Sequence, residues 1–272
     1  MDTGQQVDCT GSAPSVSSMR YRLISCRVLE REMAAAIARS PNDVDIEYLP
    51  KGLHDLPSRE MRQCLQTTLD GTGEEQYDAV LFGYGLCNNG LDGLTAGKQP
   101  IVVPRAHDCI TLFLGSKERY LDYFQQNPGT YFLTSGWIEH GEVTGELRQL
   151  TIQHAAGMDK RLEELVAHYG EDNARFLYDT LCAADRHYGQ YTFIEMGVEP
   201  DNRFEQIARE RAATRGWTYK RIQGSMSLLQ RLVDGDWTQG AFLVVAPGWR
   251  VKADYSEGII TAVPAGRPPG AS

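Results

Sequence analysis

Short apolar runs and stretches of helical periodicity alternate along the first part of the chain. Residues 21–26, 79–82 and 101–103 are apolar runs of strand length, and residues 42–49 alternate apolar and polar positions. These patterns predict four strands, while residues 28–40 place apolar side chains at helical spacing. Because strands that alternate with helices assemble into a parallel sheet covered on both faces, we predict an α/β fold.

The same alternation returns in the last third of the chain. Residues 191–196, 218–222 and 241–246 have strand patterns, and residues 203–215 and 225–233 have helical ones. We therefore expect two Rossmann-like lobes with mainly parallel sheets, joined by a helical connection. A cleft between two such lobes is a common place for a ligand.

The middle section sets the boundaries of the predicted domains. Residues 117–126 look helical, residues 130–138 look extended, and residues 158–188 carry two helical patterns interrupted near Gly170. The predicted domains are a disordered leader at 1–20, a first α/β lobe with the candidate site at 21–116, a mainly helical connection at 117–190, a second α/β lobe at 191–263 and a disordered tail at 264–272.

Composition narrows the functional class. The 272 residues include 27 Lys and Arg against 36 Asp and Glu, a net charge of −9, which argues against non-specific nucleic-acid binding. No apolar run approaches the roughly 20 residues of a membrane span, and residues 1–18 lack the features of a secretory signal. Six cysteines are too sparse for a disulfide scaffold. We expect a cytoplasmic protein that binds a small molecule, with neither nucleic acid nor membrane as partner.

Reactive side chains follow successive strands of the first predicted lobe. The first strand ends in Cys26, the third is followed by Cys87 and the fourth by Cys109, while His54 and His107 follow the second and fourth strands. Because ligands of parallel α/β sheets gather outside the carboxyl ends of the strands, these groups are expected at one rim.

Thiolates and imidazole are the ligands that zinc and iron prefer, so Cys26, Cys87, Cys109 and His107 form a candidate Cys₃His metal site. His107 and Cys109 point the same way if their segment stays extended. Zinc is the first candidate, with iron or an iron–sulfur cluster as the alternative. A metal-free site is also open, with one cysteine as nucleophile and His107 as base. Free cysteines are often buried simply as small apolar side chains, and packing is the third interpretation.

Other residues at the same rim receive candidate roles. Arg105 would orient an anionic substrate through its planar guanidinium, and His54 is a second candidate base. The glycine-rich stretch that holds Gly83, Gly85 and Asn88 is a candidate cofactor-binding loop. It lacks the spacing of known phosphate loops, and a glycine turn that presents Cys87 to the crevice is the simpler interpretation. Cys64 and Cys182 lie in helical patterns and are expected to be packing residues.

The stretches around these residues resemble the DUF1638 family, a group of prokaryotic proteins of unknown function. The resemblance covers roughly residues 22–246, and its matching stretches are 26–32, 53–55, 81–90, 104–110, 115–116 and 128–131. It implies an association with corrinoid-dependent methyl metabolism. His107 and Cys109 also resemble half of the zinc site of corrinoid-linked thiol methyltransferases, in which the remaining cysteine lies downstream, whereas Cys26 and Cys87 lie upstream here.

The leading hypothesis is a metal-binding enzyme of small-molecule or one-carbon metabolism that transfers a methyl group to or from a thiol or a corrinoid. Zinc bound to a thiol would lower its pKa and favour the nucleophilic thiolate. One alternative is a non-catalytic protein that binds a metal or cofactor for a partner methyltransferase, with a corrinoid protein as partner. The other is the metal-free cysteine enzyme described above.

Overall fold

The computed structural model describes residues 18–73, 77–141, 166, 170, 171, 173, 175, 188–254 and 256–266. Most of the predicted leader, most of the two helical patterns at 158–188 and most of the predicted tail lie outside these residues. The described part is a mixed α/β structure in which most strand pairs are parallel, so the predicted fold class is confirmed at that level.

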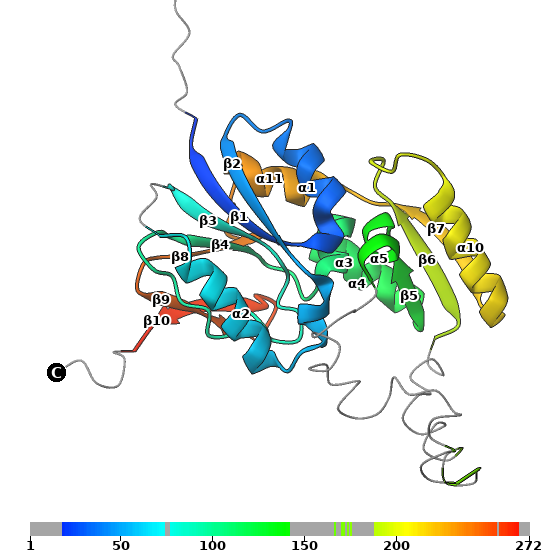
Figure 1. The fold of residues 1–272 in the computed structure, drawn as a ribbon. Helices are drawn as coiled ribbons and strands as arrows, with labels where there is room; N and C mark the ends of the chain where they lie inside the picture. Colours follow the sequence, from blue (N-terminus) through cyan, green and yellow to red (C-terminus); the bar gives the residue numbers. More distant parts are fainter. Residues whose placement is uncertain are drawn as a thin grey trace, which may run out of the picture.

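The first sheet has five strands in the order β2-β1-β3-β4-β8 (Figure 1). Its first four strands are parallel, and β8 runs antiparallel to β4. The strands are β1 (Arg20–Cys26), β2 (Asp43–Leu49), β3 (Ala79–Gly83), β4 (Ile101–Pro104) and β8 (Phe242–Val245). Every residue of β3 and β4 is buried, which agrees with the continuous apolar runs that predicted them.

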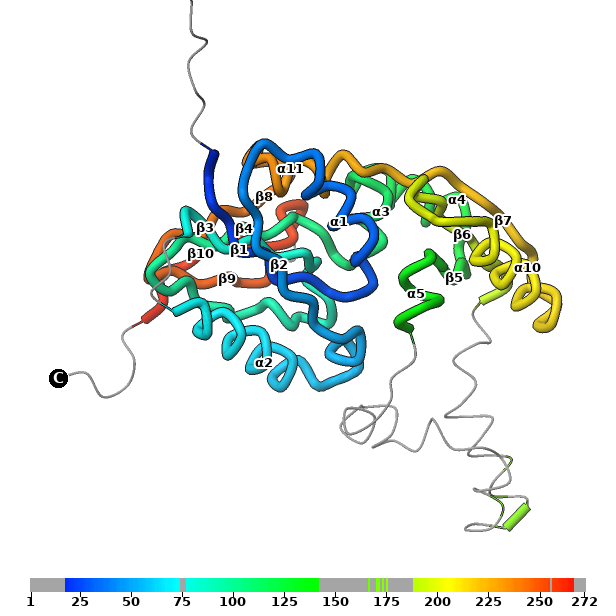
Figure 2. Tube along the Cα trace, turned by 45° about the horizontal axis from the view of Figure 1, so that its top comes forward, coloured from blue at the N-terminus to red at the C-terminus, as the bar shows by residue number. Residues whose placement is uncertain are grey.

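Helices cover both faces of this sheet, as Figures 1 and 2 show. On one face α1 (Glu30–Ile37) packs against α11 (Ser227–Asp234), and on the other lies α2 (Ser58–Asp70). Buried apolar residues of α2 and α11 recur every three or four positions and face the core. Two short 3₁₀ helices, η1 (Arg27–Leu29) and η2 (Lys51–Asp55), follow β1 and β2 directly.

The second sheet is smaller and wholly parallel, with the strand order β5-β6-β7. It consists of β5 (Thr130–Leu133), β6 (Gln190–Glu195) and β7 (Thr218–Gln223), with α10 (Arg203–Arg215) packed on β6 and β7. The remaining elements are α3 (Cys109–Leu114), α4 (Lys117–Gln126), α5 (Ser135–His140) and an antiparallel hairpin of β9 (Trp249–Ala253) and β10 (Ile260–Pro264).

Two strands pair across the predicted domain boundaries. The strand expected at 241–246 in the second lobe is β8, which joins the first sheet beside β4. The stretch 130–138 is extended only as far as Leu133. Its strand β5 lies within the predicted helical connection at 117–190 but pairs with β6 of the second sheet. Its strand ends because the Thr134 hydroxyl accepts a hydrogen bond from the Trp137 backbone N–H at 3.2 Å and caps α5. The domain boundaries themselves stay a prediction.

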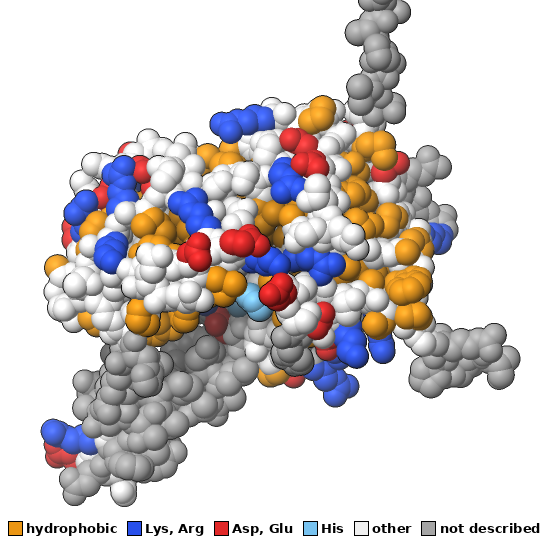
Figure 3. Space-filling model, turned by 180° about the vertical axis from the view of Figure 1, so that it is seen from behind, with side chains coloured by type: hydrophobic (Ala, Val, Ile, Leu, Met, Phe, Trp, Pro, Cys, Tyr) orange, Lys and Arg blue, Asp and Glu red, His pale blue; other side chains and the backbone are white. Residues whose placement is uncertain are grey.

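Two hydrophobic cores lie under the two sheets, and the indole of Trp137 packs against both. On the face shown in Figure 3, basic side chains are interspersed with acidic ones. Within the described residues, no helix has the length and apolar character needed to cross a membrane.

Candidate functional site

Three cysteines gather at the carboxyl ends of β1, β3 and β4, as the sequence predicts. Cys26 ends β1, Cys87 lies four residues beyond β3, and Cys109 is the first residue of α3, which follows β4. All three are buried free thiols, and we call them the thiol cluster. They lie close enough for the negative charge of one to raise the pKa of the others.

An imidazole lies against the thiol cluster, and it belongs to His54. Its Nε2 atom lies 3.2 Å from the Sγ atom of Cys26, within hydrogen-bond distance for sulfur. The ring also stacks on Tyr84, with centroids 5.6 Å apart and planes inclined by 29°. His54 sits on η2, where Lys51 pairs with Asp55 at 2.8 Å. The structure therefore brings His54 into contact with a thiol, and its role as a base stays a prediction.

The loop that carries Cys87 is held in an uncommon backbone conformation. Cys87, Asn88 and Asn89 have φ angles of 39°, 52° and 57°, in the left-handed region. Side chains other than glycine adopt this region at a cost, on the order of 1 kcal/mol per residue. The segment after β4 holds the loop in place, because the Cys87 N–H donates a hydrogen bond to the His107 carbonyl at 2.9 Å. Such strain concentrates at functional sites.

Asp108 holds the segment between β4 and α3. Its Oδ1 atom accepts hydrogen bonds from the backbone N–H groups of Ile110 and Thr111, at 3.0 and 3.3 Å, and so caps α3. Its Oδ2 atom accepts one from the Tyr120 hydroxyl at 3.3 Å. Burial raises the pKa of Asp108, and these hydrogen bonds oppose that rise. The carboxyl group is therefore a structural cap that also adds negative character beside Cys109.

Burial controls the protonation states in the cluster. It raises the pKa of Cys26 to about 12 and raises those of Cys87 and Cys109 well above the ordinary thiol value. It lowers the pKa of His54 to about 4, and the nearby Lys51 adds to this effect. At neutral pH the thiols are therefore protonated and the imidazole is neutral.

A pocket of about 360 Å³ opens above the cluster, and we call it the thiol pocket. Its inner wall includes His54, Cys87, Asp108 and Cys109. Its other walls are largely aromatic, from Tyr120, Phe124, Tyr131, Phe132, Trp137 and Tyr188. Helix α5 reaches this place because Gly136 packs against the Val28 carbonyl, where a Cβ atom would lie only 1.8 Å from the oxygen. The pocket thus lies where residues that follow β2, β3 and β4 meet residues of β5.

A family model described as protein of unknown function (DUF1638) matches residues 48–233, more than half of the 272-residue chain. The chain belongs to the DUF1638 family. No curated protein and no solved structure matches it. The matched range includes His54, Cys87 and Cys109 but begins after Cys26.

His107 lies apart from the pocket of this DUF1638 protein. Its side chain is exposed and is not among the residues that line the thiol pocket. The expectation that His107 and Cys109 point the same way required an extended segment, but Asp108 caps a helix that begins at Cys109. The alternation of a strand is therefore interrupted between them.

Arg105, predicted to orient an anionic substrate, instead binds the backbone near the C-terminal hairpin. Its guanidinium donates to the carbonyls of Gln239 and Phe242 at 2.9 and 3.3 Å, and to those of Gly258 and Ile260. These contacts place it outside the lining of the thiol pocket and join β4 to β10. Arg105 therefore links the end of β4 to distant segments of the chain.

The glycine-rich loop of the DUF1638 protein is shaped by packing. A Cβ atom at Gly83 would lie 2.3 Å from the Ser25 hydroxyl oxygen, and one at Gly85 would lie 2.8 Å from the Asp108 backbone. The space beside both glycines is therefore filled by protein. Asn88 lines the thiol pocket, and its side chain donates to the Leu56 carbonyl at 3.1 Å.

Among the described residues, no three His, Cys, Asp or Glu side chains are arranged to hold one metal ion. The candidate set of Cys26, Cys87, Cys109 and His107 is not among such groups, and its role as a metal site stays a prediction. The prediction that Cys64 is a packing residue is wrong, because it lies on the exposed side of α2. Cys182 lies outside the described residues.

Sequence reasoning missed the aromatic walls of the pocket and the Tyr84 hydroxyl. Tyr84 is fully buried beside the thiol cluster, and its hydroxyl has no hydrogen-bond partner among the described residues. The density of aromatic residues between 120 and 137 is the signal that could have identified the walls.

Proposed function

We propose that this DUF1638 protein is an enzyme of small-molecule metabolism that transfers a methyl or related carbon group to or from a thiol in the thiol pocket. The observation that carries the proposal is the 3.2 Å contact between Cys26 Sγ and His54 Nε2 beside a pocket lined by Cys87 and Cys109. A thiol that has a neutral imidazole within reach can lose its proton to it and become a nucleophile.

Ionising these thiols needs a positive charge from outside the cluster. The pKa of Cys26 is about 12 and that of His54 about 4. A gap of about eight pKa units corresponds to on the order of 10 kcal/mol for proton transfer between the two groups, before their mutual attraction is counted. A cation bound in the pocket would lower this cost, because it favours the thiolate electrostatically.

The aromatic walls support a cationic substrate as the source of that charge. Rings such as those of Tyr120, Phe132 and Trp137 attract onium cations through their faces, and Asp108 adds a carboxyl group to the same wall. With a methylated ammonium or sulfonium ion as substrate, the thiol of Cys87 or Cys109 would lose its proton to His54, which lines the same pocket. The S–CH₃ bond forms, the bond from methyl to the onium atom breaks, and its electron pair leaves with the neutral amine or thioether.

A soft metal ion is the second candidate source of charge. Three thiols and one imidazole are the donors that zinc and iron prefer, and metal binding would ionise the thiols. The described side chains are not arranged around one ion, so we derive no step through a metal. A corrinoid protein would be the partner that exchanges the methyl group in this version.

Two finer features belong to the proposal. The parallel sheets β2-β1-β3-β4 and β5-β6-β7 would be two Rossmann-like lobes. The pocket between residues that follow strands of the first sheet and residues of β5 supports this division. Four free thiols among the described cysteines support a cytoplasmic location.

The test incubates the full chain with trimethylsulfonium and locates methyl groups by peptide mass spectrometry. We expect a methyl group on Cys87 or Cys109 that is lost in the His54→Gln variant and kept in the Cys64→Ser control. Elemental analysis of the same anaerobic preparation decides between the two sources of charge. About one zinc or iron per chain, lost in Cys87→Ser and Cys109→Ser, would select the metal. If the chain is not methylated and also holds no metal, the proposal is overturned.

A further inference from the structure

Trp137 carries a buried hydrogen-bond donor that has no acceptor. Its Nε1 atom is buried, and no group among the described residues accepts a hydrogen bond from it. An indole N–H can donate a hydrogen bond but cannot accept one. Because an unpaired buried donor is unfavourable and rare, this atom points to an acceptor that becomes strong only at another stage of the protein's work.

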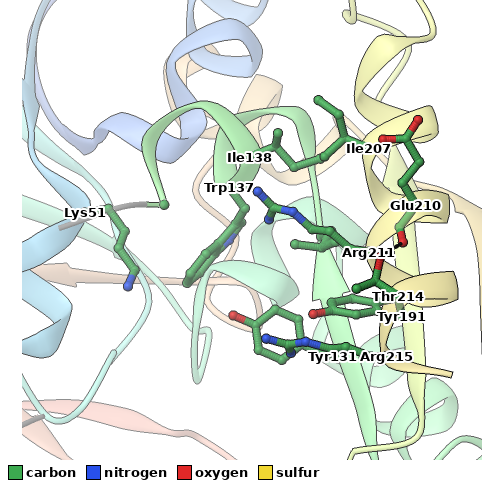
Figure 4. A pocket seen from close by; sticks show the side chains of 12 residues that line it. Lys51, Tyr131, Trp137, Ile138, Tyr191, Ile207, Glu210, Arg211, Thr214 and Arg215 are labelled. Atoms are coloured by element: carbon green, nitrogen blue, oxygen red, sulfur yellow. Dashed lines mark hydrogen bonds between the residues drawn. The ribbon is translucent and has the colours of Figure 1, made fainter. Parts of the chain in front are cut away.

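The indole of Trp137 is held in a fixed place at the wall of the thiol pocket. Its ring packs against both hydrophobic cores, and the preceding Gly136 packs against the Val28 carbonyl. Figure 4, which draws a neighbouring pocket of about 650 Å³, shows the indole extending from α5 towards Lys51 of η2. The Lys51 ammonium lies 5.1 Å from the centre of the ring, a contact that favours this orientation. The N–H donor therefore has a fixed direction.

The acceptor within reach of this donor is the sulfur of Cys109. Both residues line the thiol pocket. Burial raises the pKa of Cys109 well above the ordinary thiol value, and hydrogen bonding from the Trp137 side chain opposes that rise. A neutral thiol is a weak acceptor, whereas a charged sulfur is a strong one. The N–H is therefore unpaired beside the resting thiol and gains its hydrogen bond when the sulfur becomes negative.

Cys87, the other cysteine that lines the thiol pocket, has different donors. Burial raises its pKa too, but the hydrogen bonds that oppose this rise come from the backbone N–H groups of Gly85 and Cys109. A side-chain donor with no other partner is a group set in advance for charge that develops during a reaction. Of the two cysteines in the pocket wall, Cys109 is the one that Trp137 serves in this way.

We propose that Trp137 is a positioning residue whose indole N–H donates to the sulfur of Cys109 as that sulfur becomes negative, so that Cys109 rather than Cys87 is the nucleophile of the thiol pocket. The proposal rests on the proposed function only for the identity of the transferred group. In the transfer from an onium ion, the Cys109 proton goes to His54 and the sulfur bonds to the methyl carbon. The electron pair of the broken bond leaves with the neutral amine or thioether, and the indole keeps its proton throughout.

The experiment measures the rates at which iodoacetamide alkylates Cys109 and Cys87 in the full chain, at one mildly alkaline pH, by peptide mass spectrometry. The test variant carries benzothienylalanine at position 137, which keeps the shape of the indole and has sulfur in place of the N–H. We expect Cys109 to react roughly tenfold more slowly or less, because a hydrogen bond to a charged acceptor is lost. The rate at Cys87 should not change.

The sign of this effect separates it from a structural one. A loosened pocket would expose Cys109 and make it react faster, whereas loss of the donor makes it react more slowly. Trp137→Phe should give the same ratio of the two rates as the benzothiophene variant. Trp237→Phe is the matched control, because its indole donates to the Leu232 carbonyl at 2.8 Å and should leave both rates unchanged. An unchanged rate at Cys109 in the benzothiophene variant, or equal slowing of both cysteines, would overturn the proposal.

Incubation with trimethylsulfonium then tests the choice of cysteine. We expect the methyl group on Cys109, and a methyl group on Cys87 instead would overturn the assignment of Cys109 as the nucleophile. Slower alkylation of Cys109 in the benzothiophene variant, together with no methylation of the wild type, would support the role of Trp137 and count against the proposed transfer alone. The two proposals therefore fail separately.

Discussion

Glu32 is a buried carboxyl group whose ionisation should make the fold less stable as pH rises. It lies on α1 with no exposed surface, and neither of its oxygens has a hydrogen-bond partner among the described residues. Burial raises its pKa from 4.5 to about 8, the negative charges of Glu199 and Glu139 add to the rise, and only Arg31 among the nearby charges opposes it.

The size of the effect follows from the difference between folded and unfolded states. A rise from 4.5 to about 8, at about 1.4 kcal/mol per pKa unit, corresponds to about 5 kcal/mol of stability. Because the folded state holds the proton more tightly, the full stability is present below pH 4.5 and is lost as pH rises through 8. Near pH 7 the loss is about 3 kcal/mol, because the unfolded chain has already ionised.

The perturbation is Glu32→Gln, which keeps the shape of the side chain and removes its titration. Denaturant unfolding at pH 5.5, 7 and 8.5 measures the free energy of unfolding of the variant and the wild type. We expect the variant to be more stable, by an amount that grows with pH towards several kcal/mol. Glu60→Gln, at an exposed position of α2, should show no such trend. A difference between Glu32→Gln and wild type that is the same at all three pH values would refute the reasoning.

Two further predictions concern the thiol site. Gly85→Ala would put a Cβ atom 2.8 Å from the Asp108 backbone, and should cost about 2 kcal/mol or more in thermal unfolding; an unchanged melting temperature would contradict this. Iodoacetamide at neutral pH should modify the exposed Cys64 well before the buried Cys26 or Cys109, whose pKa values are raised. Peptide mass spectrometry gives the order, and rapid labelling of Cys109 would show that it is already a thiolate.

The parallel strands of the first sheet were predictable because each is a short apolar run or a clear alternation. The place of β8 was not, because the apolar stretch Phe242–Val245 reads the same in either sheet. Only pairing with β4, in the antiparallel direction, decides its position. The strand predicted over residues 130–138 is too long, because Tyr131, Phe132 and Trp137 all favour strands. The Thr134 cap that starts α5 is a local hydrogen bond, which the periodicity of the sequence does not reveal.

The thiol cluster could be predicted because strand order needs only to be parallel for Cys26, Cys87 and Cys109 to share a rim. Which imidazole lies against the thiols could not be predicted, since His54 and His107 both follow a strand within a few residues in the sequence. The cap at Asp108 turns the chain into a helix and leaves His107 exposed, while η2 folds His54 back over Cys26.

The thiol pocket restricts what kind of molecule this site can take. Its aromatic faces and the carboxyl group of Asp108 favour a cation over an anion. One of these faces is the indole of Trp137, which packs against both hydrophobic cores and directly follows the Gly136 contact with Val28. This wall of the pocket is thus fixed by the packing of the two sheets rather than by a loop of its own.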